Sequence, residues 1–468
     1  MNVLNNSLES RQYSTIQLLQ DKYYNKKYTE DYNTQLERLQ YLFPDKYPVG
    51  QGSKILCNVT IQVTEDCNLR CSYCYQIAKT KKKLKFETAK KFIDILLDPD
   101  QSKNKYINTY DTSFVVLDFI GGEPLLEIDL ITDICRYFTK RVIELNHPWK
   151  VGYMFSIGTN GVLYFDPKVQ AFIDEFKGRV SFSITLDGDK QLHDSCRVFP
   201  DGSGSYDLAS AACVDWMHRI GYNGIMSSKL TIAPGNVSYL SSAITHMISL
   251  GYTNINENCV YEEGWTAEHA RILYQELKKI ADYILDNDLE DKITLRIFDP
   301  IMYSPMDPED NQNWCGGDGS MIALDVNGDI FNCIRYMESS LGNDREPLVI
   351  GNVEDGISCT ESHTCNVNCM RCVNRRSQST DECFNCPIAR GCGWCSAYNY
   401  QKFGTVNHRA TYICIMHKAE ALGNAYYWNK LLIKHNESHG YELYCPKEWA
   451  LQIISEDEYN MLYEMSIR

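Results

Sequence analysis

Apolar residues follow two alternating patterns between residues 55 and 285. Short stretches in which every second residue is apolar are typical of half-buried strands, and the stretches between them, with apolar residues every three or four positions, are typical of amphipathic helices. The expected strands span residues 55–63, 114–120, 151–157, 180–186, 229–232 and 254–261. The expected helices span residues 87–97, 128–145, 166–176, 208–220, 237–250 and 267–285. Six strand–helix repeats predict an α/β fold, a partial (β/α)6 barrel that is open on one side.

The pattern changes from Cys315 onward, where cysteines become frequent and regular periodicity fades. A chain of 468 residues is long enough for two or three domains. Two weak helices are predicted before the first strand, at residues 15–22 and 29–42. The expected division is an N-terminal helical segment over 1–50, the barrel over 51–300, a cysteine-rich domain over 301–420 and a helical tail over 421–468.

Composition narrows the class of protein. Hydrophobic residues make up 44% and charged residues 23% of the chain, which is ordinary for a soluble globular protein. No apolar run is long enough to span a membrane, and the first residues have no secretory pattern, so we expect a cytoplasmic protein without a membrane partner. A net charge of −15 disfavours binding to nucleic acids. Twenty cysteines in a reducing compartment indicate metal or redox use rather than a disulfide framework.

The earliest group of chemically informative cysteines directly follows the first strand. Cys67, Cys71 and Cys74 have the spacing C-x3-C-x2-C. Three thiolates can hold a [4Fe-4S] cluster but leave one of its four irons without a protein ligand. A strand that ends in such a loop favours an enzyme site, because ligands gather at the carboxyl ends of barrel strands. A zinc site, a disulfide cluster or three unrelated thiols are the alternatives.

The loop resembles that of the radical S-adenosylmethionine (radical SAM) superfamily, and Tyr73 before the third cysteine adds to the likeness. The resemblance implies that the open iron binds S-adenosylmethionine (AdoMet) and that reductive cleavage gives a 5′-deoxyadenosyl radical. Cys67, Cys71 and Cys74 would then be the catalytic cluster ligands. The second strand runs into Gly121-Gly122-Glu123-Pro124, which matches the GGEP motif of that superfamily.

The resemblance also implies the AdoMet contacts. Glycines allow close backbone approach, and a carboxylate supplies charge-assisted hydrogen bonds to the methionine ammonium. Residues 183–188, His193-Asp194-Ser195-Cys196-Arg197 and residues 202–206 resemble the SxDG, HDxxR and GxGSF run of peptide-maturing relatives. The implied cofactor-binding residues are Tyr73, Gly121, Gly122, Glu123, Thr185 and Arg197.

Seven later cysteines match the SPASM domain, which binds two auxiliary [4Fe-4S] clusters. The resemblance assigns Cys315, Cys333 and Cys395 to the first auxiliary cluster. It assigns Cys383, Cys386, Cys392 and Cys414 to the second. The two residues between Cys392 and Cys395 depart from the three that are common in the family, and the first cluster lacks a fourth ligand. The implied cofactors are therefore AdoMet and three [4Fe-4S] clusters.

An insertion separates the two parts of this domain and carries Cys359, Cys365, Cys369 and Cys372. These cysteines either supply the missing ligand, hold a zinc ion or a further cluster, or form a reduced loop. Although the last three repeat the C-x3-C-x2-C spacing, no strand precedes them and no GGEP follows, so a second AdoMet site is not expected. Buried free thiols are expected at Cys57, Cys135, Cys196, Cys213, Cys259 and Cys445.

The ordered motifs over residues 54–420 resemble radical SAM/SPASM maturases of ribosomally synthesised peptides, and most of all the group associated with CXXX-repeat target peptides. The resemblance implies an oxidoreductase that forms thioether links in a cysteine-containing precursor peptide, with flavodoxin or ferredoxin as electron donor. Residues 1–50 would be a partial leader-peptide recognition element or a helical lid.

Other functions remain open at this stage. Formylglycine formation of the sulfatase-maturase type is disfavoured because Ile334-Arg335, and not an aspartate, follows Cys333. Epimerisation and carbon–carbon crosslinking would use the same radical. The non-enzyme alternative is a cysteine-rich zinc-binding adaptor, for which the GGEP and HDxxR motifs would have no use.

Overall fold

A computed structural model describes residues 58–220, 227–260, 264–311, 315, 321–393 and 395–468. The helices predicted at 15–22 and 29–42, the predicted N-terminal segment as a whole, and Cys57 lie outside the described residues. Within the described part, no helix is both long and apolar enough to cross a membrane.

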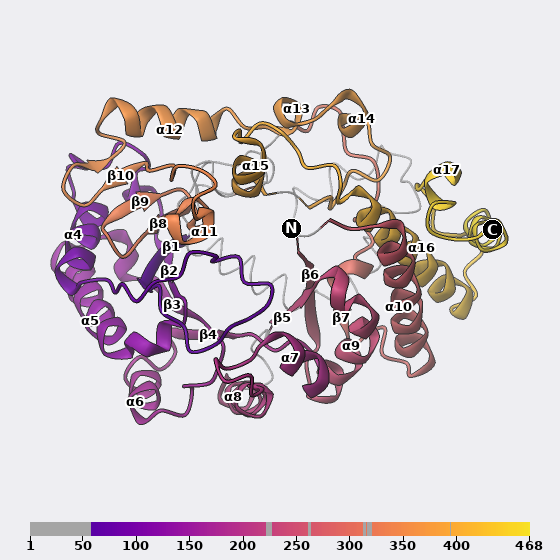
Figure 1. Cartoon of the computed structure of the whole chain (residues 1–468), viewed down its shortest axis with the longest axis horizontal. Coiled ribbons are helices and arrows are strands. Elements are labelled where there is room, and N and C mark those ends of the chain that lie inside the picture. Colours follow the sequence, from indigo (N-terminus) through magenta and orange to yellow (C-terminus); the bar gives the residue numbers. More distant parts are fainter. Residues whose placement is uncertain (1–57, 221–226, 261–263, 312–314, 316–320, 394) are drawn as a thin grey trace, which may run out of the picture.

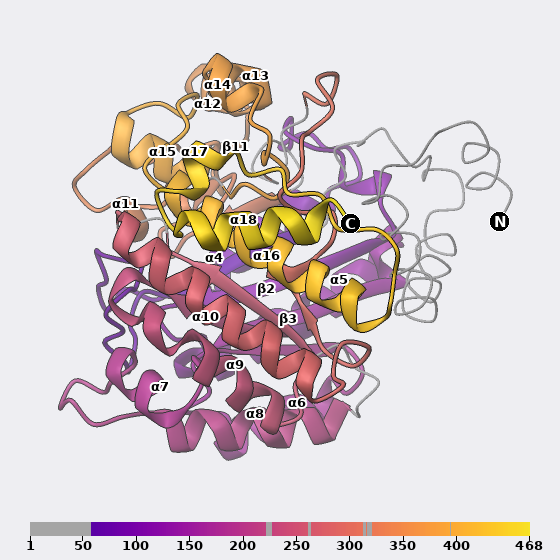
Figure 2. The same cartoon turned by 90° about the vertical axis from the view of Figure 1, so that its right-hand side faces the viewer.

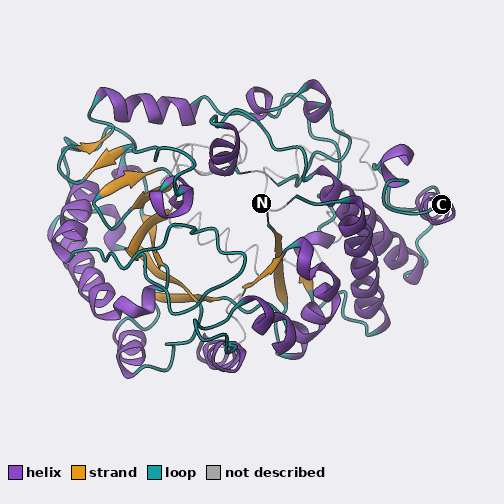
Figure 3. Ribbon diagram, in the orientation of Figure 1, coloured by secondary structure: helices purple, strands orange, loops and turns teal. Residues whose placement is uncertain are grey.

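The first four strands form a parallel sheet in sequence order. They are β1 (Asn58–Thr64), β2 (Phe114–Gly121), β3 (Gly152–Thr159) and β4 (Val180–Ile184). A second parallel sheet contains β5 (Ser227–Ile232), β6 (Asn254–Cys259) and the short β7 (Thr294–Leu295). Figure 3 shows the two sheets as parts of one arc of strands with helices outside it. The predicted α/β partial barrel is confirmed, with a division of the sheet between β4 and β5.

Helices cover the outer face of this arc (Figure 1). They are α4 (Phe86–Leu97), α5 (Ile128–Glu144), α6 (Pro167–Glu175), α8 (Tyr206–Ile220), α9 (Leu240–Ser249) and α10 (Ala267–Asp286). Each was expected within a few residues, because one apolar stripe faces the sheet. In α4, Phe92, Leu96 and Leu97 are fully covered, whereas Lys91 is exposed.

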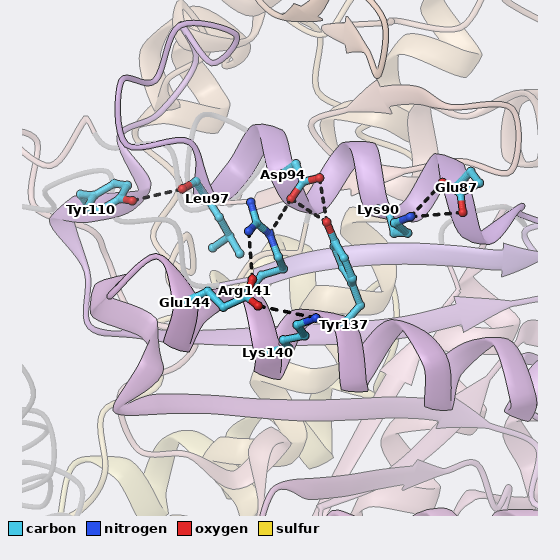
Figure 4. A network of polar contacts seen from close by, with 9 residues as sticks. All are labelled: Glu87, Lys90, Asp94, Leu97, Tyr110, Tyr137, Lys140, Arg141 and Glu144. Atoms are coloured by element: carbon cyan, nitrogen blue, oxygen red, sulfur yellow. Dashed lines mark hydrogen bonds and ion pairs between the residues drawn. The ribbon is translucent and has the colours of Figure 1, made fainter.

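Polar side chains join the first two of these helices (Figure 4). Asp94 of α4 accepts hydrogen bonds from the Tyr137 hydroxyl at 2.8 Å and from Arg141 Nε at 3.0 Å, both on α5. Arg141 also contacts Glu144 one turn further along, at 3.1 Å. The network fixes the side-by-side arrangement of α4 and α5 over the strands.

Two local features between the strands differ from the expectation. The helix α7 (Lys190–Cys196) was not predicted, because seven residues are too few for a periodic signal. Its start was nevertheless encoded by Asp189, whose carboxylate accepts the Leu192 N–H at 2.9 Å as an N-cap. The helix expected from residue 237 begins later, since Pro234–Tyr239 forms a 3-10 turn before α9.

The cysteine-rich region extends the first sheet. The strand β8 (Met321–Leu324) lies parallel to β1, on the side opposite β2. It is followed by the antiparallel strands β9 (Asp329–Phe331), β10 (Gly351–Asn352) and β11 (Gly356–Ile357). The sequence did not predict this pairing, and Cys333 lies two residues after the end of β9.

The turn between β8 and β9 is not the type that its sequence favours. The run Asn327-Gly328 is typical of a type I′ turn, which needs a positive φ at both residues. Only Gly328 has one, at +99°. The Asp325 carboxylate accepts the N–H groups of residues 327, 328 and 329 at 2.8–2.9 Å. These bonds favour an ordinary turn followed by one left-handed glycine.

Short helices and one long helix complete the chain. The short ones are α11 (Glu338–Leu341), α12 (Glu361–Arg371), α13 (Arg375–Gln378), α14 (Asp381–Phe384), α15 (Ser396–Phe403), α17 (Lys447–Ala450) and α18 (Glu456–Ser466). The long helix α16 (Cys414–Lys434) runs along α10 (Figure 2). Gly423 allows this approach, because a Cβ there would lie 2.6 Å from the Leu277 side chain.

Candidate active site

The loop after β1 holds three free thiols. Cys67 is 7% exposed, and Cys71 and Cys74 are half-buried. The loop is anchored to the segment after α7, because Arg70 N–H donates to the Val198 carbonyl at 2.7 Å and Ser72 N–H donates to the Cys196 carbonyl at 3.0 Å. Burial raises the pKa of Cys71 to about 11, the nearby Arg197 lowers it, and Cys74 and Cys67 raise it further. The three thiols therefore lie within electrostatic reach of one another.

The two glycines of the GGEP motif are required by the cluster loop itself. Gly122 N–H donates to the Thr64 carbonyl at 2.9 Å, and Glu123 N–H donates to the Asp66 carbonyl at 2.8 Å. A Cβ on Gly122 would lie 2.2 Å from the Asp66 carbonyl oxygen, and a Cβ on Gly121 would lie 2.5 Å from that of Thr64. A side chain at either position would therefore push the loop away from β2.

Glu123 is 1% exposed and ties the end of β2 to the end of β3. Its carboxylate accepts hydrogen bonds from Thr159 Oγ1 at 2.6 Å, from Asn160 N–H at 2.9 Å and from Leu125 N–H at 3.0 Å. Burial raises the pKa of Glu123, and these hydrogen bonds oppose the rise. Its predicted contact with a methionine ammonium stays a prediction, and its observed contacts give it a positioning role.

A buried polar triad joins the cluster loop to β4. The Tyr73 hydroxyl donates to the Asp187 carboxylate, and Arg197 Nη1 donates to the Tyr73 oxygen at 2.8 Å. Asp187 is fully buried and lies 3.9 Å from Arg197 Nη1. Arg197 Nε is buried and has no hydrogen-bond partner in the described part of the chain. The arrangement places the Arg197 guanidinium beside Cys71 of the cluster loop.

Asp187 was not among the predicted site residues, although it lies in the SxDG-like run that pointed to Thr185. The structure brings Tyr73 and Arg197 together but leaves the half-buried Thr185 outside their network. Thr185 N–H instead donates to the Thr159 carbonyl at 3.0 Å.

Residues in and after the HDxxR-like run form hydrogen bonds to the backbone of this triad. His193 Nδ1 accepts the Asp187 N–H at 3.3 Å, and its Nε2 lies 3.0 Å from Ser205 Oγ. Ser205 Oγ in turn donates to the Arg197 carbonyl at 2.8 Å. Burial lowers the pKa of His193 to about 3, and Arg197 lowers it further, so the ring is neutral and can accept at Nδ1.

The three cysteines predicted for the first auxiliary cluster lie in one neighbourhood. Burial raises the pKa of Cys333 to about 12, and the adjacent Cys395 and Cys315 add to the rise. Cys315 Sγ lies 3.8 Å from Ser396 Oγ, which accepts the Tyr336 hydroxyl at 2.9 Å. Cys315 and Cys395 are thus brought together although 79 residues separate them.

The four cysteines predicted for the second auxiliary cluster form another group. Burial raises the pKa of Cys392 to about 12, and the nearby Cys414, Cys386 and Cys383 contribute in the same direction. Arg409 opposes this rise, so a positive charge lies next to the group. Free thiols with an adjacent cation fit the thiolate ligands that an iron–sulfur cluster requires.

Tyr75 and Arg335 lie between the first two thiol groups and were missed at the sequence level. The Arg335 guanidinium lies 4.9 Å from the Tyr75 ring centre. Burial raises the pKa of Tyr75, Cys74 and Cys333 raise it further, and Arg335 opposes the rise. No local pattern marks this contact, because β8 has to pair with β1 before it can form.

The remaining described cysteines divide into a buried group and an exposed group. Cys135, Cys196, Cys213, Cys259 and Cys445 are all buried free thiols. The four cysteines of the insertion are all exposed, and three of them belong to α12 or its C-terminal cap. Among the described residues, no group of three or more His, Cys, Asp or Glu side chains has the arrangement of a site for a single metal ion.

Comparison with known proteins first finds a similarity in the region of the cluster loop. Residues 49–177 match the family described as a 4Fe-4S single cluster domain, and this range contains Cys67, Cys71, Cys74 and the GGEP motif. An uncharacterized protein of Methanocaldococcus jannaschii is 28% identical over 207 residues, which are 42% of this chain and 61% of that protein. A serine-type anaerobic sulfatase-maturating enzyme of Bacteroides thetaiotaomicron is 28% identical over 149 residues, 30% of this chain and 31% of that protein. The chain therefore matches less than two thirds of either relative.

Solved structures then identify the fold. Native anSMEcpe with bound AdoMet aligns with 81% of this chain and 99% of its own, with a TM-score of 0.57 and 15% identity. Streptococcus suis SuiB bound to precursor peptide SuiA aligns with 82% of this chain and 80% of its own, with a TM-score of 0.50 and 14% identity. The predicted fold is confirmed by these structures, and the match of residues 49–177 to a 4Fe-4S single cluster domain agrees with the predicted cluster loop.

Proposed function

We propose that this chain is a radical SAM enzyme that modifies a cysteine-containing precursor peptide. The observation that carries the proposal is the position of three free thiols on a loop that begins at the carboxyl end of β1 and lies beside the buried Arg197. Ligands and substrates of barrel enzymes gather at this face. The similarity of the fold to anSMEcpe with bound AdoMet supports the same assignment.

The residues around the loop suit a bound cluster and AdoMet. Cys67, Cys71 and Cys74 would hold a [4Fe-4S] cluster with one open iron. Tyr73, Gly121, Gly122, Glu123, Thr185 and Arg197 are the proposed AdoMet contacts. With both groups bound, the cofactors would supply one electron for reductive cleavage of the sulfonium and a 5′-deoxyadenosyl radical that abstracts hydrogen. Arg197, held by Asp187 and Tyr73, would orient a carboxylate through its planar guanidinium.

The later cysteine groups would hold two auxiliary clusters, in a domain that we place at residues 301–420, after a barrel at 51–300 and before a helical tail at 421–468. Cys315, Cys333 and Cys395 supply three ligands to the first, and Cys383, Cys386, Cys392 and Cys414 supply four to the second. With only three cysteines in the first group, one iron there would be free to bind a thiolate of the substrate. The product would then be a thioether between a cysteine sulfur and a peptide carbon, and flavodoxin or ferredoxin would exchange electrons with the clusters.

Formylglycine formation is the second candidate, because a sulfatase-maturating enzyme is among the relatives. The residue after Cys333 disfavours it. Ile334 carries no titratable group, and Arg335, which contacts the Tyr75 ring, cannot act as a base at neutral pH. A general base must lie within hydrogen-bonding reach of the proton that it removes.

An anaerobic assay tests the proposal. The full chain, reconstituted with iron and sulfide, is incubated with AdoMet, dithionite and a peptide with regularly spaced cysteines. We expect 5′-deoxyadenosine, together with a peptide that has lost two hydrogens for each link and resists thiol alkylation. An aldehyde that reacts with a hydrazide would indicate formylglycine instead, and an unchanged mass with an altered chiral composition would indicate epimerisation.

Cysteine variants provide the matched control. Replacement of Cys67, Cys71 and Cys74 by alanine should abolish 5′-deoxyadenosine formation, whereas Cys135→Ala, which changes a buried thiol in α5, should preserve it. Cleavage of AdoMet by the triple variant at the rate of the unaltered protein would refute the proposal.

A further inference from the structure

The insertion places a row of three cysteines on one face of α12. Cys365, Cys369 and Cys372 follow the spacing i, i+4, i+7, which aligns side chains along one side of a helix. All three are exposed free thiols. The opposite side of the helix is buried through Val367 and Met370. Because cysteine is among the most often buried residues, an exposed row of three calls for a ligand or a partner.

The three thiols are close enough to influence one another. Burial raises the pKa of Cys369, and Cys365 and Cys372 add to the rise. Cys369 also raises the pKa of Tyr400 on α15, although burial of that tyrosine contributes more. The middle thiol of the row therefore lies within electrostatic reach of Tyr400 on α15.

A fourth cysteine lies just before the helix. The Thr364 hydroxyl in the first turn of α12 donates to the carbonyl oxygens of Ser358 at 3.1 Å and of Thr360 at 2.9 Å. Ser358 has a left-handed backbone, with φ at +56°. Cys359, between Ser358 and Thr360, is exposed, but its Sγ lies 3.5 Å from the Ile357 carbonyl oxygen, so it is directed at its own segment and not at the row.

The spacing of the three cysteines along α12 limits the kind of metal centre that they can bind. Along a helix, positions i and i+7 are about 10.5 Å apart at 1.5 Å per residue. Two sulfurs bound to one zinc ion at about 2.3 Å each are at most about 4.6 Å apart. All three thiols therefore fit poorly around a single ion. An iron–sulfur cluster offers a separate iron to each thiolate and so tolerates a wider spacing.

The row is distinct from the first auxiliary group. Met370 and Val373 belong to a small core with Tyr336 and Ala397, against which Cys333 and Cys395 are packed. The buried side of α12 thus faces the first auxiliary group, while the cysteine row lies on the exposed side. Figure 1 shows α12 along the outer edge of the cysteine-rich region.

We propose that Cys365, Cys369 and Cys372 bind an additional iron–sulfur cluster on the exposed face of α12. This cluster is separate from those of the proposed catalytic function, so it can be present or absent independently of peptide modification.

Iron and sulfide analysis tests this site. The full chain and the variant C365A/C369A/C372A are reconstituted anaerobically, and the variant should hold about four fewer irons and four fewer sulfides per chain. A matched variant of two exposed polar residues on the same helix, S362A/N368A, should keep the full content. Equal iron in the triple variant and the unaltered chain would overturn the proposal, as would loss of one zinc ion in place of iron.

Thiol labelling of the unaltered chain tests the site without relying on a folded variant. Iodoacetamide should label the peptide that spans α12 in the unaltered chain before reconstitution, and labelling at all three cysteines should fall at least tenfold afterwards. Equal labelling before and after would refute the site. Formation of 5′-deoxyadenosine by the triple variant reports separately on the proposed catalytic cluster, so failure of one proposal does not resemble failure of the other.

Discussion

The guanidinium of Arg335 lies 4.9 Å from the ring centre of Tyr75 and joins two loops that are far apart in the sequence. Tyr75 directly follows Cys74, and Arg335 comes two residues after Cys333. The contact therefore lies between the proposed AdoMet cluster and the first proposed auxiliary cluster. A positive charge at this point stabilises nearby thiolates and reduced clusters.

Removal of this charge should impair electron transfer more than folding. We expect Arg335→Gln to lower the midpoint potential of the adjacent cluster and to slow peptide modification roughly tenfold, which corresponds to about 1.4 kcal/mol in the activation barrier. Arg335→Lys, which keeps the charge, should lie between the variant and the unaltered protein. Redox titration followed by electron paramagnetic resonance measures the potential. Identical potentials in all three proteins would contradict the role assigned to the charge.

Asp187 should be important for stability, because it forms a buried ion pair with Arg197. Asp187→Asn leaves Arg197 as a buried charge without its carboxylate partner, which typically costs about 3–5 kcal/mol. We expect a clearly lower melting temperature in anaerobic thermal unfolding, together with weaker AdoMet binding by calorimetry. The control is Asp129→Asn, which removes an exposed ion pair with Lys168 and should leave the melting temperature almost unchanged. Similar melting temperatures for the two variants would contradict the prediction.

Gly122 packs against the cluster loop, so a side chain at this position should reduce the amount of iron that the chain binds. A Cβ at this position would lie 2.2 Å from the Asp66 carbonyl oxygen, so Gly122→Ala must displace the loop that carries Cys67. We expect the reconstituted variant to hold about four fewer irons per chain. Gly235→Ala is the matched control, because a Cβ there would meet no atom within 4 Å. Full iron content in Gly122→Ala would show that the loop can shift and still bind its cluster.

Glu257 should make stability depend on pH. Burial raises its carboxyl pKa to about 8, Glu420 raises it further and Arg296 opposes the rise, while Glu257 Oε2 has no hydrogen-bond partner among the described residues. Because the folded pKa lies above the unfolded value near 4.5, this contribution to stability is complete below pH 4.5 and is lost as pH rises towards 8.

Between pH 4.5 and about 8, the free energy of unfolding can fall by about 1.4 kcal/mol per pH unit because of Glu257. Melting temperatures of the unaltered chain and of Glu257→Gln, measured from pH 5 to pH 9, test this dependence. The difference between them should change across the window and level off above pH 8. A constant difference would mean that Glu257 titrates near its ordinary pKa.

The repeated strands and helices of the barrel could be predicted from the sequence, because each depends on a periodicity carried by neighbouring residues. The strand β2 and the helix α4 begin and end within one residue of their expected limits. The type of the turn at Gly328 could not be read from its Asn-Gly run, since it depends on the hydrogen bonds of Asp325.

The candidate site was predictable where its residues form local motifs. The loop from Cys67 to Cys74 and the GGEP run could both be recognised, as could Arg197. Asp187 could have been found from the same SxDG-like run that suggested Thr185. Tyr75 and Arg335 carried no such signal, because nothing in their own segments indicates that they meet.

The sequence alone determined the spacing of the cysteines and the order in which the barrel strands follow one another along the chain. Both are properties of short consecutive segments. Only the tertiary structure decided that β8 lies beside β1, that Cys315 approaches Cys395, and that the cysteine row of α12 faces outward. The physical reason is that such contacts depend on which apolar faces the whole chain buries together, and no local pattern specifies that choice.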